Sequence, residues 1–138
     1  MDAYLKMLKE DKRKITPRRK AVIALFMEQR TSLGPYEVFQ KLRKKISPLG
    51  LPTVYRILEE LKDLGILIGV PAEDRQLHYM LCRSPEEHHH HFVCRKCKKT
   101  EEVEYCNFDE VSRFIEKKLH GTVEQHSLHI EGLCSQCR

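Results

Sequence analysis

In the first part of the chain, apolar residues recur at helical spacing in three stretches, and each stretch opens with a proline. Pro17, Pro35 and Pro52 stand at these openings, and proline is favoured at the first position of a helix. Thr16 supplies a capping hydroxyl for the first stretch, and Gly65 is a typical stop for the third. The pattern predicts three short helices, whose apolar positions are Val22, Ile23, Phe26 and Met27, then Val38, Phe39 and Leu42, then Val54, Ile57, Leu58, Leu61 and Leu64.

The residues after the third helix favour a β-hairpin. Residues 66–70 and 77–81 are mostly apolar, and the turn-like residues 71–75 separate them. Three helices followed by a hairpin predict a winged helix-turn-helix domain. Thr53, Tyr55 and Arg56 lie in the first turns of the third helix and outside its apolar stripe, where recognition helices contact DNA.

The pattern changes in the last third of the chain. Residues 101–105 alternate as a strand does, residues 108–119 have apolar positions at helical spacing, and residues 122–130 again favour a strand. The overall fold class is therefore α+β. We expect a winged-helix DNA-binding domain over residues 1–82, a polar, proline-containing hinge over 83–87, and a dimerisation and metal-binding domain over 88–138.

Charge separates the same two parts. Residues 1–83 carry 17 Lys and Arg against 10 Asp and Glu, whereas residues 84–138 carry 8 against 10. A basic domain of this kind suits a nucleic acid, and Lys14 and Arg19 belong to a basic cluster fit for phosphates. For any single lysine, a solvated helix face is the alternative. No apolar run approaches the roughly 20 residues of a membrane span, so we expect no membrane association and a cytoplasmic location.

The cysteines form two C-x-x-C pairs, Cys94 with Cys97 and Cys134 with Cys137. Two such pairs complete a closed tetrahedral site, so the spacing predicts one structural zinc ion per protomer. A single pair would also suit a redox dithiol. Four reduced cysteines buried as small apolar residues are disfavoured, because polar residues surround all four.

Four consecutive histidines, residues 88–91, precede Phe92, Val93 and Cys94. If they form a strand, His88 and His90 point to one side and His89 and His91 to the other, so one strand feeds two metal sites. A loosely metal-binding polar run is the alternative. Residues that could complete such sites are Cys82, Asp109, Glu110 and His126.

These motifs together resemble the ferric uptake regulator family of metal-sensing repressors over essentially the whole chain. The resemblance rests on TPRRK at 16–20, GLPTVYR at 50–56, HHHHFVCRKC at 88–97 and LCSQC at 133–137. It implies a homodimer that binds a palindromic double-stranded DNA operator when loaded with metal. It also implies that Arg19, Tyr55 and Arg56 contact DNA and that the paired cysteines hold structural zinc.

Within that family the chain looks like a zinc sensor. Ser32 stands where iron and peroxide sensors usually have a histidine, and Tyr79-Met80-Leu81-Cys82 fits the zinc branch. A thiolate ligand also favours zinc over ferrous iron.

By the same resemblance, Cys82, His89 and His91 form the sensing site, with one or two regulatory zinc ions per protomer. Its fourth ligand stays open among Glu73, Asp74, His78 and others. A second site uses His88, His90, Asp109 and His126, with Asp109 preferred over Glu110.

The alternatives to a zinc-sensing repressor are an iron or peroxide sensor of the same family, a zinc hydrolase, or a zinc buffer. No H-E-x-x-H helix or other catalytic signature is present, so we predict that the protein is not an enzyme. A buffer would leave the basic winged-helix part unexplained.

Overall fold

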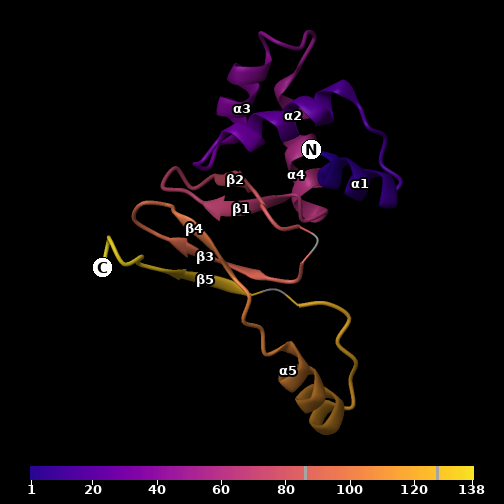
Figure 1. The fold of residues 1–138 in the computed structure, drawn as a ribbon, viewed down its shortest axis with the longest axis vertical. Coiled ribbons are helices and arrows are strands. Elements are labelled where there is room, and N and C mark those ends of the chain that lie inside the picture. Colours follow the sequence, from indigo (N-terminus) through magenta and orange to yellow (C-terminus); the bar gives the residue numbers. More distant parts are fainter. Residues whose placement is uncertain (86, 127) are drawn as a thin grey trace. The chain divides into compact units, whose positions relative to one another are not determined.

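The computed structural model describes residues 1–85, 87–126 and 128–138, which divide into an N-terminal unit, Met1–Glu86, and a C-terminal unit, Glu87–Arg138. The boundary falls within the predicted hinge, of which Glu86 lies outside the described residues. The N-terminal unit contains α1 (Asp2–Glu10), α2 (Pro17–Glu28), α3 (Pro35–Leu42) and α4 (Leu51–Asp63), followed by β1 (Leu67–Pro71) and β2 (Leu77–Leu81) (Figure 1).

Local signals set the boundaries of these helices. The hydroxyl of Thr16 accepts a hydrogen bond from the Arg19 amide (3.2 Å), and Pro17 follows as the first helical residue of α2. Gly65 has a φ of 76° after the end of α4, a conformation that costs glycine little. The apolar faces of α2, α3 and α4 meet in one core, in which Phe26, Val38 and Leu58 are at most 1% exposed.

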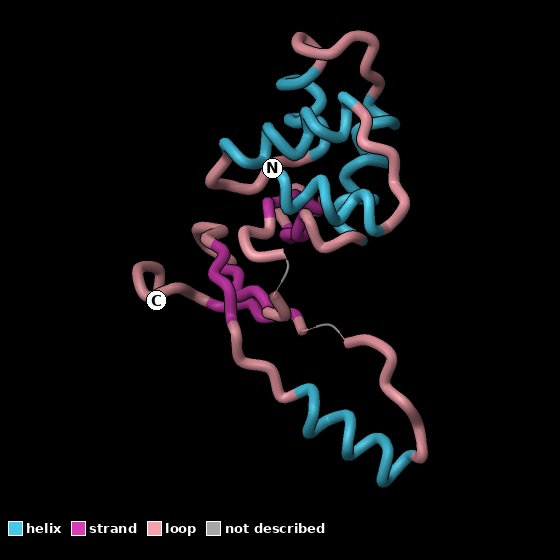
Figure 2. Tube along the Cα trace, turned by 45° about the vertical axis from the view of Figure 1, so that its right-hand side comes forward, coloured by secondary structure: helices cyan, strands magenta, loops and turns pink. Residues whose placement is uncertain are grey.

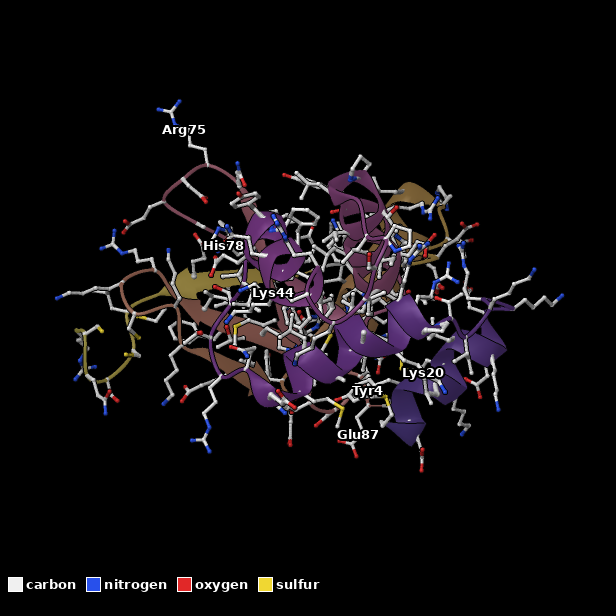
Figure 3. The ribbon with its side chains drawn as sticks, turned by 90° about the horizontal axis from the view of Figure 1, so that it is seen from above. Tyr4, Lys20, Lys44, Arg75, His78 and Glu87 are labelled. Atoms are coloured by element: carbon white, nitrogen blue, oxygen red, sulfur yellow. The ribbon has the colours of Figure 1, made fainter. Side chains whose placement is uncertain are left out.

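The wing is an antiparallel hairpin in which Leu67 pairs with Leu81 and Pro71 with Leu77. Leu33 extends it, because its amide and carbonyl exchange two 2.9 Å hydrogen bonds with Tyr79. Figure 3 shows Arg75 at the tip of the loop, reaching away from the ribbon. The winged helix-turn-helix predicted from the sequence is therefore present.

Helix α1 was not predicted. It has no side-chain cap, but Tyr4 and Leu8 lie four residues apart and are buried, and Asp2 in the first turn and Lys9 in the last turn complement the helix dipole. The hydroxyl of Tyr4 donates to the Cys82 carbonyl (2.9 Å), so α1 is attached to the residue that follows β2.

The C-terminal unit is built on a three-stranded sheet with the order β4-β3-β5 (Figure 2). Strand β3 (His90–Cys94) is central; β4 (Thr100–Val103) runs antiparallel to it and β5 (His129–Gly132) parallel. Between β4 and β5 lie α5 (Phe108–Phe114) and its π-helical continuation, η1 (Ile115–Leu119). Figures 1 and 2 both show α5 extending away from this sheet.

The predicted strand over 122–130 is wrong in extent. Residues 122–126 are irregular, Ser127 lies outside the described residues, and the strand β5 begins only at His129. The apolar alternation there is weak, because Val123 is followed by the polar residues Glu124, Gln125 and His126.

Candidate metal centres and nucleic-acid surface

The two C-x-x-C turns meet at one end of the sheet. Cys94 ends β3 and pairs in parallel register with Gly132 of β5, so the turn after β5 lies beside the turn after β3. The ligand atoms of Cys94, Cys97, Cys134 and Cys137 all lie within 4.8 Å of one another. The sequence spacing therefore corresponds to one compact cluster of four thiols.

The geometry and electrostatics of this cluster fit a zinc ion. Sγ atoms of Cys97 and Cys134 are 3.7 Å apart, close to the edge of about 3.8 Å that a tetrahedron with Zn–S bonds of about 2.3 Å requires. Backbone amides of Cys97 and Cys134 donate to Cys94 and lower its pKa to about 6. A hydrogen bond with Cys134 raises the pKa of Cys137 to about 12, so a bound cation would displace protons from the cluster.

A second cluster lies where β3, the start of α5 and the segment before β5 come together. The ligand atoms of His88, His90, Cys106 and His126 lie within 4.8 Å of one another. Sequence reasoning named the three histidines but assigned no role to Cys106. Asp109, the predicted fourth ligand, is outside this group but lines a hollow together with His88, Cys106 and His126. Glu110 is exposed on α5.

His90 is the buried member of the second cluster. His90 is only 6% exposed, and its Nε2 has no hydrogen-bond partner within the described part of the chain. Burial, followed by the proximity of His88, lowers the pKa of His90. Its imidazole is therefore held in the neutral form, which is the form that binds a metal.

The other two histidines face a carboxylate. Nε2 atoms of His89 and His91 are 3.0 Å apart, and His89 Nε2 is 3.9 Å from a carboxylate oxygen of Glu102. Glu102 is the register partner of His91 on β4, so the sheet fixes this placement. Sequence reasoning missed Glu102, although its position in the alternating segment 101–105 was the available signal. Burial lowers the pKa of His91.

The remaining candidate ligands belong to the N-terminal unit. Cys82 directly follows β2, and its amide donates to the Ile66 carbonyl (2.9 Å). Asp74 accepts a 2.9 Å hydrogen bond from His78, and Glu73 is exposed. Within the described ranges, no group of three or more metal-ligating side chains includes Glu73, Asp74 or His78. Asp74 in the loop instead pairs with His78 at the start of β2.

The predicted DNA-contacting residues lie on and near α4. Tyr55 is 42% exposed and Arg56 is also exposed, so both side chains are accessible on the helix surface. A shallow hollow between α2 and α4 is lined by Thr16, Arg18, Arg19, Thr53, Arg56 and Ile57. Lys14 is exposed in the segment before α2.

Arg19 has a structural partner that the sequence did not indicate. Two guanidinium nitrogens donate to one carboxylate oxygen of Glu60 on α4, at 2.7 and 3.1 Å, and a third donates to the Lys14 carbonyl (2.7 Å). Both side chains of the ion pair are largely buried. Arg19 therefore joins α2 to α4, which is a positioning role for the helix that carries Arg56.

A winged helix-turn-helix followed by a unit with clustered thiols and imidazoles defines a metal-responsive regulator of transcription. The sequence profile described as the Ferric uptake regulator family matches residues 10–131, and the chain belongs to this family. Members of this family are regulators and not enzymes, so the prediction that the protein is not an enzyme is confirmed.

Relatives with three different names resemble the chain. The Ferric uptake regulation protein of Bacillus subtilis is 30% identical over 99% of this chain and 93% of its own length. The peroxide-responsive repressor PerR of Staphylococcus saprophyticus is 27% identical over 91% and 82%. A solved zinc uptake regulator in complex with zinc and DNA has a TM-score of 0.72 at 23% identity, covering 95% of this chain and 87% of the other, and shares the fold.

None of the helices in the described ranges has the length and apolar character that a membrane span requires.

Proposed function

We propose that the protein is a zinc-responsive repressor that binds a palindromic operator as a homodimer and represses metal-uptake genes in the cytoplasm. The observation that carries the proposal is the donor chemistry around the histidine run. His89 and His91 present adjacent imidazole nitrogens beside Glu102. The cysteine that precedes them in the sequence is Cys82. Nitrogen and sulfur donors together favour zinc.

The sensing site of this proposal takes Cys82 from one unit and His89 and His91 from the other. Glu102 is a candidate for the open fourth position, because it is the register partner of His91. Glu73, Asp74 and His78 are weaker candidates, since Asp74 and His78 are already paired with each other. The four paired cysteines bind structural zinc.

The regulatory step follows from where these residues lie in the chain. When bound, the ion supplies a cross-link between the two units. Cys82 is attached to the wing through the Ile66 carbonyl and to α1 through Tyr4, so restraining Cys82 restrains the whole N-terminal unit. Such a site strengthens DNA binding only by favouring one arrangement of the units, and a coupling of about 1–3 kcal/mol is typical.

The homodimer is supported by the exposed apolar surface around α5. None of the residues of α5 or η1 is buried, and Val111, Phe114 and Leu119 are 44%, 60% and 68% exposed. An amphipathic helix of this kind needs a covering surface. A second copy of the chain fits, because a repressor of a palindromic operator presents two recognition helices related by twofold symmetry.

An electrophoretic mobility shift tests the proposal with a duplex selected from a random-sequence pool by the zinc-loaded protein. Zinc is expected to strengthen binding roughly 5- to 150-fold, as a coupling of that size gives. Cys82→Ser should remove the zinc dependence while leaving a folded protein that keeps its structural zinc. The control Ser84→Ala, two residues from Cys82 and outside the clusters of metal-ligating side chains, should leave the zinc-dependent shift in place. Zinc-dependent binding by Cys82→Ser would refute the sensing assignment.

The second candidate is an iron or peroxide sensor, which the names of the Bacillus and Staphylococcus relatives favour. It predicts that ferrous or manganous ion, and not zinc, gates the same shift at equal free concentration. Ser32 weighs against it, because its hydroxyl stands where those sensors supply an imidazole.

A further inference from the structure

We propose that Cys106 is a metal ligand and that it completes a site of three imidazoles and one thiolate with His88, His90 and His126. This site is separate from the zinc-sensing residues and does not depend on which metal the protein senses. The proposal differs from the sequence prediction in the fourth ligand, which is the thiolate of Cys106 and not the carboxylate of Asp109. The ligand class is a divalent ion that accepts both nitrogen and sulfur, such as zinc or cobalt.

The three imidazoles already converge. Ring centroids of His88 and His90 are 5.0 Å apart, and those of His126 lie 4.9 Å and 5.2 Å from them. His90 is 6% exposed, and its Nε2 has no partner among residues 1–85, 87–126 and 128–138. A buried ring nitrogen without a partner is unfavourable, so this atom points to a ligand that would satisfy it.

Cys106 occupies the position of the fourth ligand. Its Sγ is 3.4 Å from Nε2 of His126, close to the separation of about 3.6 Å expected for sulfur and nitrogen on one tetrahedral zinc ion. Phe108 stacks on the His126 ring, with centroids 4.3 Å apart and planes at 15°, which fixes the ring that faces Cys106.

Asp109 is close to the site but less well placed. It is the second residue of α5 and lines the hollow beside His88 and His126, yet it is outside the group of donor atoms within 4.8 Å of one another. Cys106 directly precedes Asn107, the N-cap of α5. A metal held by Cys106 and the histidines would therefore attach the base of α5 to β3 and to the segment before β5.

Cobalt titration of the full-length protein tests the ligand set. The structural site is first filled with zinc, and Cys82→Ser serves as the background, so that Cys106 is the only thiol left for cobalt. Sulfur-to-cobalt charge-transfer absorption is expected in this background and in its Asp109→Asn derivative. It should be lost in the Cys106→Ser derivative, with metal affinity falling by more than the roughly 10- to 100-fold that an outer-shell change costs.

Alkylation of Cys106, located by mass spectrometry, gives a second readout that does not require the variant to bind metal. Zinc or cobalt should protect Cys106 in the background protein, and His126→Ala should remove that protection. The proposal is overturned if cobalt binds without charge-transfer absorption, if Cys106 stays reactive in the metal-loaded protein, or if Asp109→Asn lowers affinity as much as Cys106→Ser does.

Discussion

Replacing Arg19 with methionine is expected to destabilise the N-terminal unit by about 2–3 kcal/mol. The Arg19 and Glu60 side chains are only 15% and 18% exposed, which places the pair between exposed pairs worth about 0.2–1 kcal/mol and buried pairs whose disruption costs about 3–5 kcal/mol. Both nitrogens that face Glu60 donate to the same oxygen, so the substitution leaves that carboxylate without its cation. Glu60→Gln should lower the free energy of unfolding somewhat less, because the substitution leaves no unpaired carboxylate at position 60.

Urea denaturation followed by circular dichroism at helical wavelengths measures this effect, because α1–α4 supply most of the helix. The midpoint should fall without a change in slope, and a loss of about 2 kcal/mol should lower the Tm by roughly 8–16 °C for a unit of this size. The double variant Arg19→Met/Glu60→Gln should cost about 1–2 kcal/mol less than the sum of the single variants.

Lys20→Met is the matched control, since Lys20 is an exposed cation next to Arg19 on α2. It should change stability by less than about 0.5 kcal/mol. If Arg19→Met is equally silent in stability and still weakens operator binding, the ion-pair reasoning is refuted. Arg19 would then act through DNA contact, as the family resemblance implies.

Three further outcomes are expected. Cys94→Ser should unfold the C-terminal unit and leave the N-terminal unit folded, because structural zinc contributes folding free energy; a zinc-free variant with dispersed amide resonances for residues 87–138 would contradict this. Leu119→Glu should produce monomers in sedimentation velocity, whereas the exposed control Lys117→Glu should remain dimeric, and an unchanged Leu119→Glu dimer would remove α5 from the interface. Tyr79→Phe should cost about 1 kcal/mol at neutral pH, because the Tyr79 hydroxyl donates to Glu59 and lowers the pKa of that carboxylate. The stability difference between the wild type and Tyr79→Phe should be complete above about pH 4.3, the pKa of a glutamate in the unfolded chain, and should disappear as the pH falls through the lower pKa of Glu59 in the folded protein. A stability difference that does not change with pH would exclude Glu59 as its cause.

The features predicted from sequence were those that local spacing determines. Proline and glycine punctuation located α2–α4, and two-residue spacing placed the four thiols in one cluster. Strand alternation grouped His88 with His90 and His89 with His91, and the structure groups them in the same way. These are short-range consequences of backbone geometry.

The features that were missed depend on tertiary contacts. Glu60 lies 41 residues from Arg19, and only the packing of α2 against α4 brings them together. Cys106 meets His126 because the chain returns after α5, although 20 residues separate the two. Glu102 required the register between β3 and β4. No periodicity in one segment specifies such pairings.

The central position of β3 constrains how this chain can vary. Residues 88–94 supply histidines to two clusters on opposite faces and a cysteine to a third. Deleting one residue between His91 and Cys94 would either move Cys94 away from its partners or exchange the two histidine pairs between faces, since side chains alternate along a strand. Substitutions can alter one of these side-chain clusters at a time, but a change in length here displaces either the cysteine cluster or both histidine pairs. Sequence length between residues 88 and 94 should therefore be fixed among functional variants, even where individual ligands differ.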